Sequence, residues 1–180
     1  MNYENTIASK RKSSLPDTHF VNGSVYTNKA IFQKEKEKIF FHTWHFICHE
    51  SEVLRKYDFR TISFLGQPLI IIRGGDNKIR SFLNVCSHRG AKIIHAPSGN
   101  SKKLTCFYHL WSYNDRGDCI SIPRENGYDN SNLKKNLCGL TELKTDVFMG
   151  MVFISFNEKI MPLNDFIGDS LSSFKNTLCS

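Results

Sequence analysis

Apolar residues follow two different spacings along this chain of 180 residues. Between Asn28 and Trp44 they recur at intervals of roughly two helical turns with charged residues between them, and Thr27 or Asn28 stands in front as a suitable N-cap. This pattern predicts the best helix of the chain. After Phe59 the pattern changes to short apolar or alternating runs, which turn signals such as GQP, GGDN and NDRG separate. Runs of this kind predict β-strands.

The connections between the predicted strands are too short for crossover helices, so the strands should pair antiparallel. Residues 123–139 contain few apolar positions and are predicted to form a surface excursion, and the segment PLNDFIGDSLSSF is predicted to form a short helix. The sequence therefore predicts a mainly β, antiparallel fold with an N-terminal helix. The predicted strands are FRTISF, LIIIR, KIRSFLNV, KLTC, WSYN, CISI, and a final hairpin from LTELKTDV to GMVFISF.

Composition narrows the class of protein. With 40% hydrophobic residues, the chain is long enough to bury one core. The net charge of +7 is spread along the chain, and the run QKEKEKIF mixes both signs as a solvated helix face does, so we predict no nucleic-acid partner. No apolar run is long enough for a membrane span, and the first residues lack the apolar segment of a secretory signal. We expect a cytoplasmic protein without membrane contact.

Two short segments carry the clearest chemical signal, NVCSHRGA at residues 84–91 and TCFYHLWSY at residues 105–113. Together they give the pattern C-x-H-x17-C-x2-H. Two thiolates and two imidazoles suit either a tetrahedral zinc ion or a [2Fe-2S] cluster with histidines on one iron. Zinc sites usually take like ligands from one turn, whereas here each loop supplies one cysteine and one histidine. This arrangement favours the two-iron cluster. The candidate ligands are Cys86, His88, Cys106 and His109.

Glycines near the two loops, Gly90 and Gly99, are expected to let the backbone close over bridging sulfides. The remaining cysteines have no companion at ligand spacing and are interpreted as structural thiols of a reducing compartment. They are Cys48, Cys119, Cys138 and Cys179.

The sequence resembles the N-terminal part of the α subunits of Rieske non-haem iron oxygenases, which hydroxylate aromatic rings or quaternary amines. The resemblance covers most of the chain, from about Ser14 to Phe166, and it includes both ligand segments together with IFFHTWHFICHESEV and LTELKTDVFMGMVFISF. It implies a Rieske-type β-sandwich or barrel with a two-loop cluster-binding lobe. It also implies that Cys86 and Cys106 bind one iron of a [2Fe-2S] cluster, that His88 and His109 bind the other, and that the cluster transfers electrons.

The resemblance further implies an arrangement of domains and partners. An arm would occupy residues 1–20, the Rieske domain residues 21–160, and residues 161–180 would begin the connection to a catalytic domain absent from this chain. That domain is expected to hold a mononuclear non-haem Fe(II), and no histidine follows His109 here. Electrons would come from an NAD(P)H-dependent reductase, a ferredoxin or both, and the full-length family suggests a homotrimer. Two alternatives stay open: a free-standing Rieske ferredoxin-like electron carrier and a zinc-binding interaction domain.

The chain departs from the family pattern at two positions beside the ligands. Ser87 stands where the family commonly has proline, and Leu110 where it commonly has glycine, which would permit a close approach or a positive φ. The respiratory class of Rieske proteins carries a disulfide between the two loops, but the corresponding positions here are Ala91 and Tyr108. We therefore predict no disulfide between the loops.

Several other residues invite a functional interpretation. His42, His45 and His49 are spaced as if on one helical face, but we interpret them as packing residues. Trp111 and Tyr113 are predicted to shield the cluster from water. We expect His95 to be partly buried or at the surface. We expect Arg89 to face a redox partner or a carboxylate of a neighbouring subunit.

Overall fold

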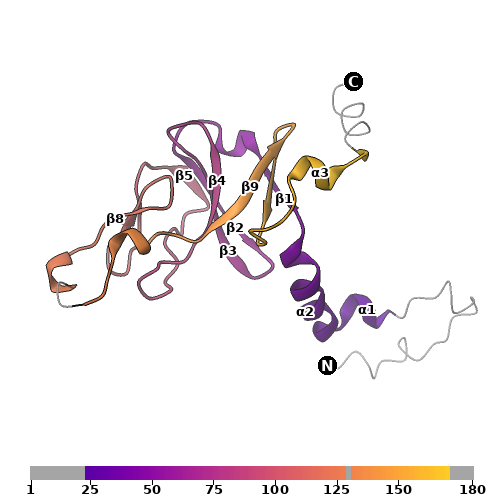
Figure 1. Cartoon of the computed structure of the whole chain (residues 1–180), viewed down its shortest axis with the longest axis horizontal. Helices are drawn as coiled ribbons and strands as arrows, with labels where there is room; N and C mark the ends of the chain where they lie inside the picture. Colours follow the sequence, from indigo (N-terminus) through magenta and orange to yellow (C-terminus); the bar gives the residue numbers. More distant parts are fainter. Residues whose placement is uncertain (1–22, 129–130, 171–180) are drawn as a thin grey trace, which may run out of the picture. The chain divides into compact units, whose positions relative to one another are not determined.

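A computed structural model of the chain describes residues 23–128 and 131–170 (Figure 1). The chain divides into two compact units, Met1–His42 and Thr43–Ser180. The predicted arm at residues 1–20 and Cys179 lie outside the described residues.

The first unit is helical in its described part. Asn28 caps the longest helix, because its side-chain oxygen accepts hydrogen bonds from the backbone N–H groups of Ala30 at 2.8 Å and Ile31 at 3.4 Å. The prediction of an N-cap at this position is confirmed. The elements are α1 (Ser24–Thr27), α2 (Lys29–Lys38) and the 3-10 helix η4 (Phe40–His42).

The prediction that this helix runs on to Trp44 was wrong. The α-helix ends at Lys38, and the C-cap residue Ile39 has left the helical region with φ of −122° and ψ of −68°. The β-branched Ile39 and the two phenylalanines that follow it lose side-chain freedom in a helix, so they give its end little support.

The second unit is built on a seven-stranded antiparallel sheet in the order β1-β10-β9-β4-β3-β2-β5, accompanied by a three-stranded sheet in the order β6-β7-β8. The prediction of a mainly antiparallel β fold is confirmed. The strands of the large sheet are β1 (His45–His49), β2 (Asp58–Phe64), β3 (Gln67–Arg73), β4 (Ile79–Leu83), β5 (Ser98–Asn100), β9 (Glu142–Phe148) and β10 (Met151–Ser155). The small sheet contains β6 (Leu104–Thr105), β7 (Ser112–Tyr113) and β8 (Cys119–Ser121).

Short helices complete the second unit: η5 (Glu50–Val53), η6 (Glu125–Tyr128), η7 (Lys135–Leu137) and α3 (Leu163–Ile167). The excursion predicted for residues 123–139 contains η6 and η7, and the short helix predicted near the C-terminus is α3. Across the described ranges, no helix is long and apolar enough to cross a lipid bilayer.

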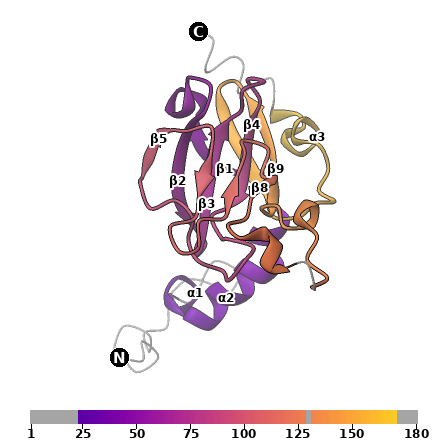
Figure 2. The ribbon, with the colours of Figure 1, turned by 90° about the vertical axis from the view of Figure 1, so that its left-hand side faces the viewer.

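Strand β3 separates two hydrophobic cores. Four consecutive residues, Leu69 to Ile72, are fully buried, and because side chains alternate along a strand, neighbouring residues serve opposite faces of the sheet. Ile70 and Ile72 pack in one core and Leu69 and Ile71 in the other. The small sheet contributes to the first core, and Figure 2 shows β8 in front of the face of the large sheet. The candidate ligand loops belong to this first core.

Candidate metal centre

The first ligand loop leaves the end of β4 and closes on itself. The N–H of Cys86 donates to the carbonyl of Ala91 at 2.8 Å, and the N–H of Gly90 donates back to the carbonyl of Cys86 at 2.9 Å. Gly90 has φ of +69°, in the left-handed region that suits glycine. Its expected role in closing the loop therefore has a conformational basis.

The second ligand loop repeats this frame between β6 and β7. The N–H of Cys106 donates to the carbonyl of Trp111 at 2.9 Å, and the N–H of Leu110 donates to the carbonyl of Cys106 at 3.0 Å. The residue in the place of Gly90 is Leu110, whose φ is +61°. The sequence comparison with the family had indicated that glycine would suit this position, and the backbone shows why. Leu110 holds a conformation that costs an L-residue about 1–2 kcal/mol.

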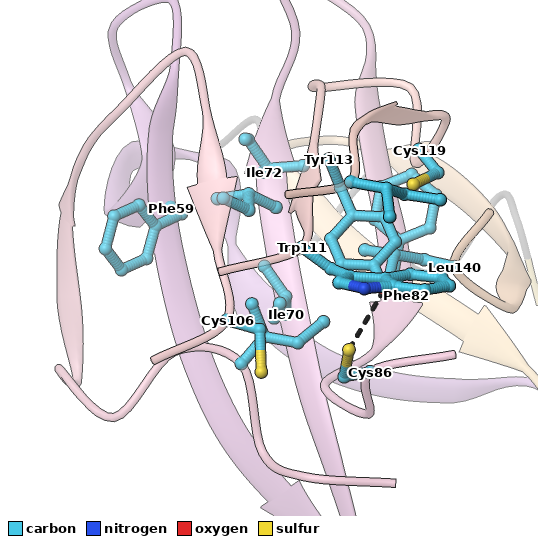
Figure 3. Close-up of a cluster of buried hydrophobic side chains, with 13 residues drawn as sticks. Phe59, Ile70, Ile72, Phe82, Cys86, Cys106, Trp111, Tyr113, Cys119 and Leu140 are labelled. Atoms are coloured by element: carbon cyan, nitrogen blue, oxygen red, sulfur yellow. Dashed lines mark hydrogen bonds between the residues drawn. The ribbon is translucent and has the colours of Figure 1, made fainter. Parts of the chain in front are cut away.

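The thiols of Cys86 and Cys106 are buried in the same hydrophobic core, and Figure 3 shows both sulfur atoms there. Burial raises the pKa of the Cys106 thiol, whereas N–H groups of Tyr108 and His109 that point at its sulfur lower this pKa. The sulfur of Cys86 lies 3.1 Å from the hydroxyl of Tyr113, which Figure 3 marks with a dashed line. These N–H and O–H groups can donate to negatively charged sulfur.

The two imidazoles form a second pair. The ring centroids of His88 and His109 are 4.6 Å apart, and the ring of His88 stacks on Trp111 at 4.8 Å with 3° between the planes. Burial is the largest cause that lowers the pKa of His88, and the positive charges of His109 and Arg89 nearby lower it further. The lower pKa favours the neutral imidazole, which is the form that binds metals. The Nδ1 atom of His88 is buried and has no hydrogen-bond partner in the described structure.

The buried side chain of Asn84 holds the backbone of the first ligand loop in place. The side-chain oxygen of Asn84 accepts hydrogen bonds from the N–H groups of Ile93 at 3.0 Å and Ile94 at 2.9 Å, and its amide nitrogen donates to the carbonyl of Ile94 at 2.8 Å. Sequence reasoning missed this role. An asparagine directly after an apolar strand was the available signal, because its short amide commonly bonds to nearby backbone.

Ser87 ties the same loop to two other segments. Its hydroxyl donates to the carbonyl of Gly139 at 2.6 Å, and its N–H donates to the hydroxyl oxygen of Tyr113 at 3.2 Å. A proline at this position could make neither bond, because it lacks both the N–H and the hydroxyl. This departure from the family pattern therefore adds contacts in this chain.

Other predicted residues take different places. His45 and His49 lie on strand β1, so the helical face expected for them with His42 does not exist. The ring of His49 instead bonds to the Ser51 hydroxyl at 2.9 Å and caps η5. Gly99 lies in β5, where an added Cβ would come within 2.7 Å of the Phe59 ring, so its role is to admit that ring and not to close a ligand loop.

Of the remaining aromatic and basic residues, some are buried and others are exposed. Trp111 and Tyr113 are buried, as expected of shielding residues. Arg89 and His95 are exposed, and the His95 ring lies 4.8 Å from the ring of Phe107. The histidine end of the centre is thus the more open end, and Phe107 is 63% exposed there.

The donor set fits a two-iron cluster. No group of three or more His, Cys, Asp or Glu side chains surrounds a single point among residues 23–128 and 131–170. The four candidate donors are instead grouped as two thiols and two imidazoles. This grouping suits two metal atoms with two protein ligands each, and a metal would also satisfy the buried Nδ1 of His88.

Comparison with known proteins shows the family to which the chain belongs. Residues 43–140 match the model of the Rieske [2Fe-2S] domain. The α subunit of 2-aminobenzenesulfonate 2,3-dioxygenase from Alcaligenes sp is 39% identical over 169 residues, which cover 93% of this chain and 43% of that subunit. The hydroxylase α subunit of methanesulfonate monooxygenase from Methylosulfonomonas methylovora is also 39% identical, over 174 residues covering 91% of this chain and 42% of its own length.

A solved structure shows the same fold. Naphthalene 1,2-dioxygenase with indole bound superposes with a TM-score of 0.78 at 32% sequence identity, over 84% of this chain and 34% of the other. The chain therefore spans less than half the length of the relatives that it matches.

Proposed function

Because the chain belongs to the Rieske [2Fe-2S] domain family, we propose that Cys86, His88, Cys106 and His109 hold a [2Fe-2S] cluster and that the domain passes electrons one at a time. One observation carries the proposal: two buried thiols and two neighbouring imidazoles converge from two loops that share one hydrogen-bonded frame. Cys86 and Cys106 bind one iron and His88 and His109 the other. When bound, the cluster supplies a one-electron carrier.

The protein's own groups set the conditions for that chemistry. Trp111 covers the ring of His88 and excludes water from the inner side of the centre. The Tyr113 hydroxyl and the N–H groups of Tyr108 and His109 donate towards the cysteine sulfurs, which stabilises negative charge there. The histidine pair lies at the more open end, so electrons leave or enter on that side.

The whole protein is proposed to be the α subunit of an oxygenase, since the relatives are named as α subunits of a dioxygenase and of a monooxygenase hydroxylase. In this proposal residues 1–20 are an arm, residues 21–160 the Rieske domain, and residues 161–180 the start of the connection to a catalytic domain with a mononuclear iron. An NAD(P)H-dependent reductase or a ferredoxin donates the electrons. The assembly is a cytoplasmic homotrimer.

Replacing either cysteine tests the cluster assignment. We expect Cys86→Ser and Cys106→Ser to abolish cluster assembly, because a serine hydroxyl does not replace a thiolate on iron. Iron and sulfide analysis together with the visible spectrum measures the result. The control is Cys48→Ser, because Cys48 is equally buried but belongs to the other hydrophobic core. Retention of two irons and of a Rieske spectrum in either ligand variant would refute the assignment.

The same spectrum separates the alternatives. A zinc-binding interaction domain is colourless, so a coloured protein with two irons excludes it. A free-standing electron carrier would have no catalytic domain in its reading frame. A longer reading frame with a two-histidine, one-carboxylate iron site would instead establish the oxygenase.

A further inference from the structure

Two thiols outside the candidate ligand set lie in the same part of the first core. Cys119 in β8 is buried, and Cys138, directly after η7, is partly buried and packs against the same cluster of side chains. Their separation in the sequence does not predict that they lie close together. Figure 3 labels Cys119 on the far side of Trp111 and Phe82 from Cys86.

Two backbone contacts bring the segments that carry the two cysteines together. The N–H of Leu140 donates to the carbonyl of Gly117 at 2.8 Å. One residue back, a Cβ added to Gly139 would lie 3.1 Å from the same carbonyl oxygen and 4.0 Å from the Cα of Asp118. The residues directly after Cys138 therefore contact the turn directly before Cys119, and η7 lies against β8. Cys138 is also near enough to Cys119 to raise the pKa of the Cys119 thiol, so the two thiols are neighbours. A disulfide between them needs Cα atoms about 4.4–6.8 Å apart.

The two thiols differ in access and surroundings. Cys138 is the more exposed, and its Sγ donates to the carbonyl of Lys134 at 3.3 Å. The ammonium group of Lys135 nearby forms an ion pair with Glu125 at 2.9 Å. Burial is the largest cause that raises the pKa of the Cys119 thiol, and the nearby Cys138 raises it further. The positive charge of Lys135 lowers it. Because its thiol is the more accessible of the two, Cys138 is the better first nucleophile.

We propose that Cys119 and Cys138 form a modification site at which a small disulfide, such as oxidised glutathione, is exchanged for a disulfide within the chain. The Cys138 thiolate attacks one sulfur of oxidised glutathione, breaks its S–S bond and releases one glutathione. Cys119 then attacks the Cys138 sulfur of the mixed disulfide and releases the second glutathione. Both cysteine sulfurs are oxidised, and the two glutathione molecules are reduced and take up the two protons.

The test uses the purified protein with its cluster bound, incubated without oxygen with oxidised glutathione. After acid quenching and alkylation, mass spectrometry of peptides identifies every modified cysteine. In the wild type, we expect Cys119 and Cys138 to lose their free thiols and to appear in one linked peptide. Dithiothreitol should separate this peptide again. Cys119→Ser should stop at a glutathione adduct on Cys138, and Cys138→Ser should leave Cys119 free because it is buried.

Cys48→Ser is the matched control, because Cys48 is a buried thiol of the other core and should not affect the linked peptide. The proposal is overturned if wild-type Cys138 stays free, ends as a stable glutathione adduct, or pairs with Cys179. It is also overturned if Cys138→Ser leaves Cys119 as readily modified as before. These readouts do not depend on which residues hold the cluster, so they stand apart from the test of the proposed function.

Discussion

At the scale of single residues, the Tyr113 hydroxyl connects two parts of the centre. It receives the N–H of Ser87 at 3.2 Å and lies 3.1 Å from the sulfur of Cys86. Because its oxygen is already an acceptor, its own proton is available for the sulfur. The sequence had indicated only a shielding aromatic ring at this position.

We predict that Tyr113→Phe lowers the reduction potential of the cluster. Adding an electron increases the negative charge on the sulfur, so losing the donor destabilises the reduced state more than the oxidised state. A hydrogen bond worth about 1 kcal/mol corresponds to a fall on the order of 40 mV for one electron. Protein-film voltammetry measures this potential. Tyr128→Phe is the control, because the Tyr128 ring contacts Trp111 and not the sulfur. An unchanged potential in Tyr113→Phe would show that the hydroxyl does not donate to Cys86.

Leu110 offers a test of backbone strain. Its side chain is 56% exposed, so replacing it removes little buried apolar surface. Its φ of +61° is an unfavourable backbone conformation for an L-residue. We expect Leu110→Gly to raise the free energy of unfolding by about 0.5–1 kcal/mol, since relief of strain exceeds the extra chain entropy of glycine. Urea unfolding measures it. Leu110→Ala keeps the Cβ and should give no gain; equal stabilisation by alanine would place the strain elsewhere.

At the scale of elements, strand β3 allows the two cores to be tested separately. Ile70 and Ile71 are adjacent, identical in type and both fully buried, but they pack on opposite faces of the sheet. Ile70 shares its core with the ligand cysteines, and Figure 3 shows it beside Cys106. The two positions therefore form a matched pair.

We predict that Ile70→Ala and Ile71→Ala each reduce the free energy of unfolding by about 2–5 kcal/mol, because each leaves a cavity in a packed core. Only Ile70→Ala should also accelerate loss of the cluster. Bleaching of visible absorption in moderate urea, compared at equal distance from each unfolding midpoint, measures that loss. Equal bleaching rates in the two variants would show that the cores are not independent around the centre.

At the scale of the whole molecule, stability should fall in acid. Hydrogen bonds from Arg80, at 3.0 Å and 2.7 Å, hold the pKa of Asp76 far below its usual value, and a hydrogen bond from Asn100 lowers that of Asp58. The folded state therefore binds these protons less readily than the unfolded state. The stabilisation is complete above the unfolded pKa of about 3.9 and is lost as pH falls towards the folded values.

Asp76→Asn tests this linkage. We expect it to lower the urea midpoint by a constant amount between neutral pH and about pH 5, and the difference from wild type to shrink below about pH 4, where the wild-type carboxylate loses its advantage. Asp165→Asn, which removes an exposed carboxylate in α3, is the control. A difference that stays constant through the acid range would mean that the Asp76 charge is not the source of the stabilisation.

Much of the second unit could be predicted from the sequence, because its signals are local. The run LIIIR and the turns GGDN and NDRG mark strands and connections that the structure contains. Strands β1 and β5 were missed, since HFICH lacks a clear alternation and SGN is wholly exposed. Their strand conformation depends on partners elsewhere in the sheet, β10 and β2.

The sequence predicted four candidate ligands for the centre but not the contacts that hold their loops in place. Residue type and spacing pointed to four candidate donors, but the hydrogen bond from Ser87 to Gly139 joins segments far apart in the chain. Such contacts depend on the folded topology. They cannot be predicted from a local sequence pattern.

The pairing of β1 with β10 has a consequence for the order of folding. His45 pairs with Ile154, so this edge of the sheet joins the two ends of the second unit, whereas the four candidate ligands lie within one short stretch of chain. Closing a long loop costs more entropy than closing a short one, and distant pairings form late. We expect the ligand lobe to reach its native contacts while the β1–β10 edge is still open, so iron and sulfide can be delivered to a chain that is only partly folded.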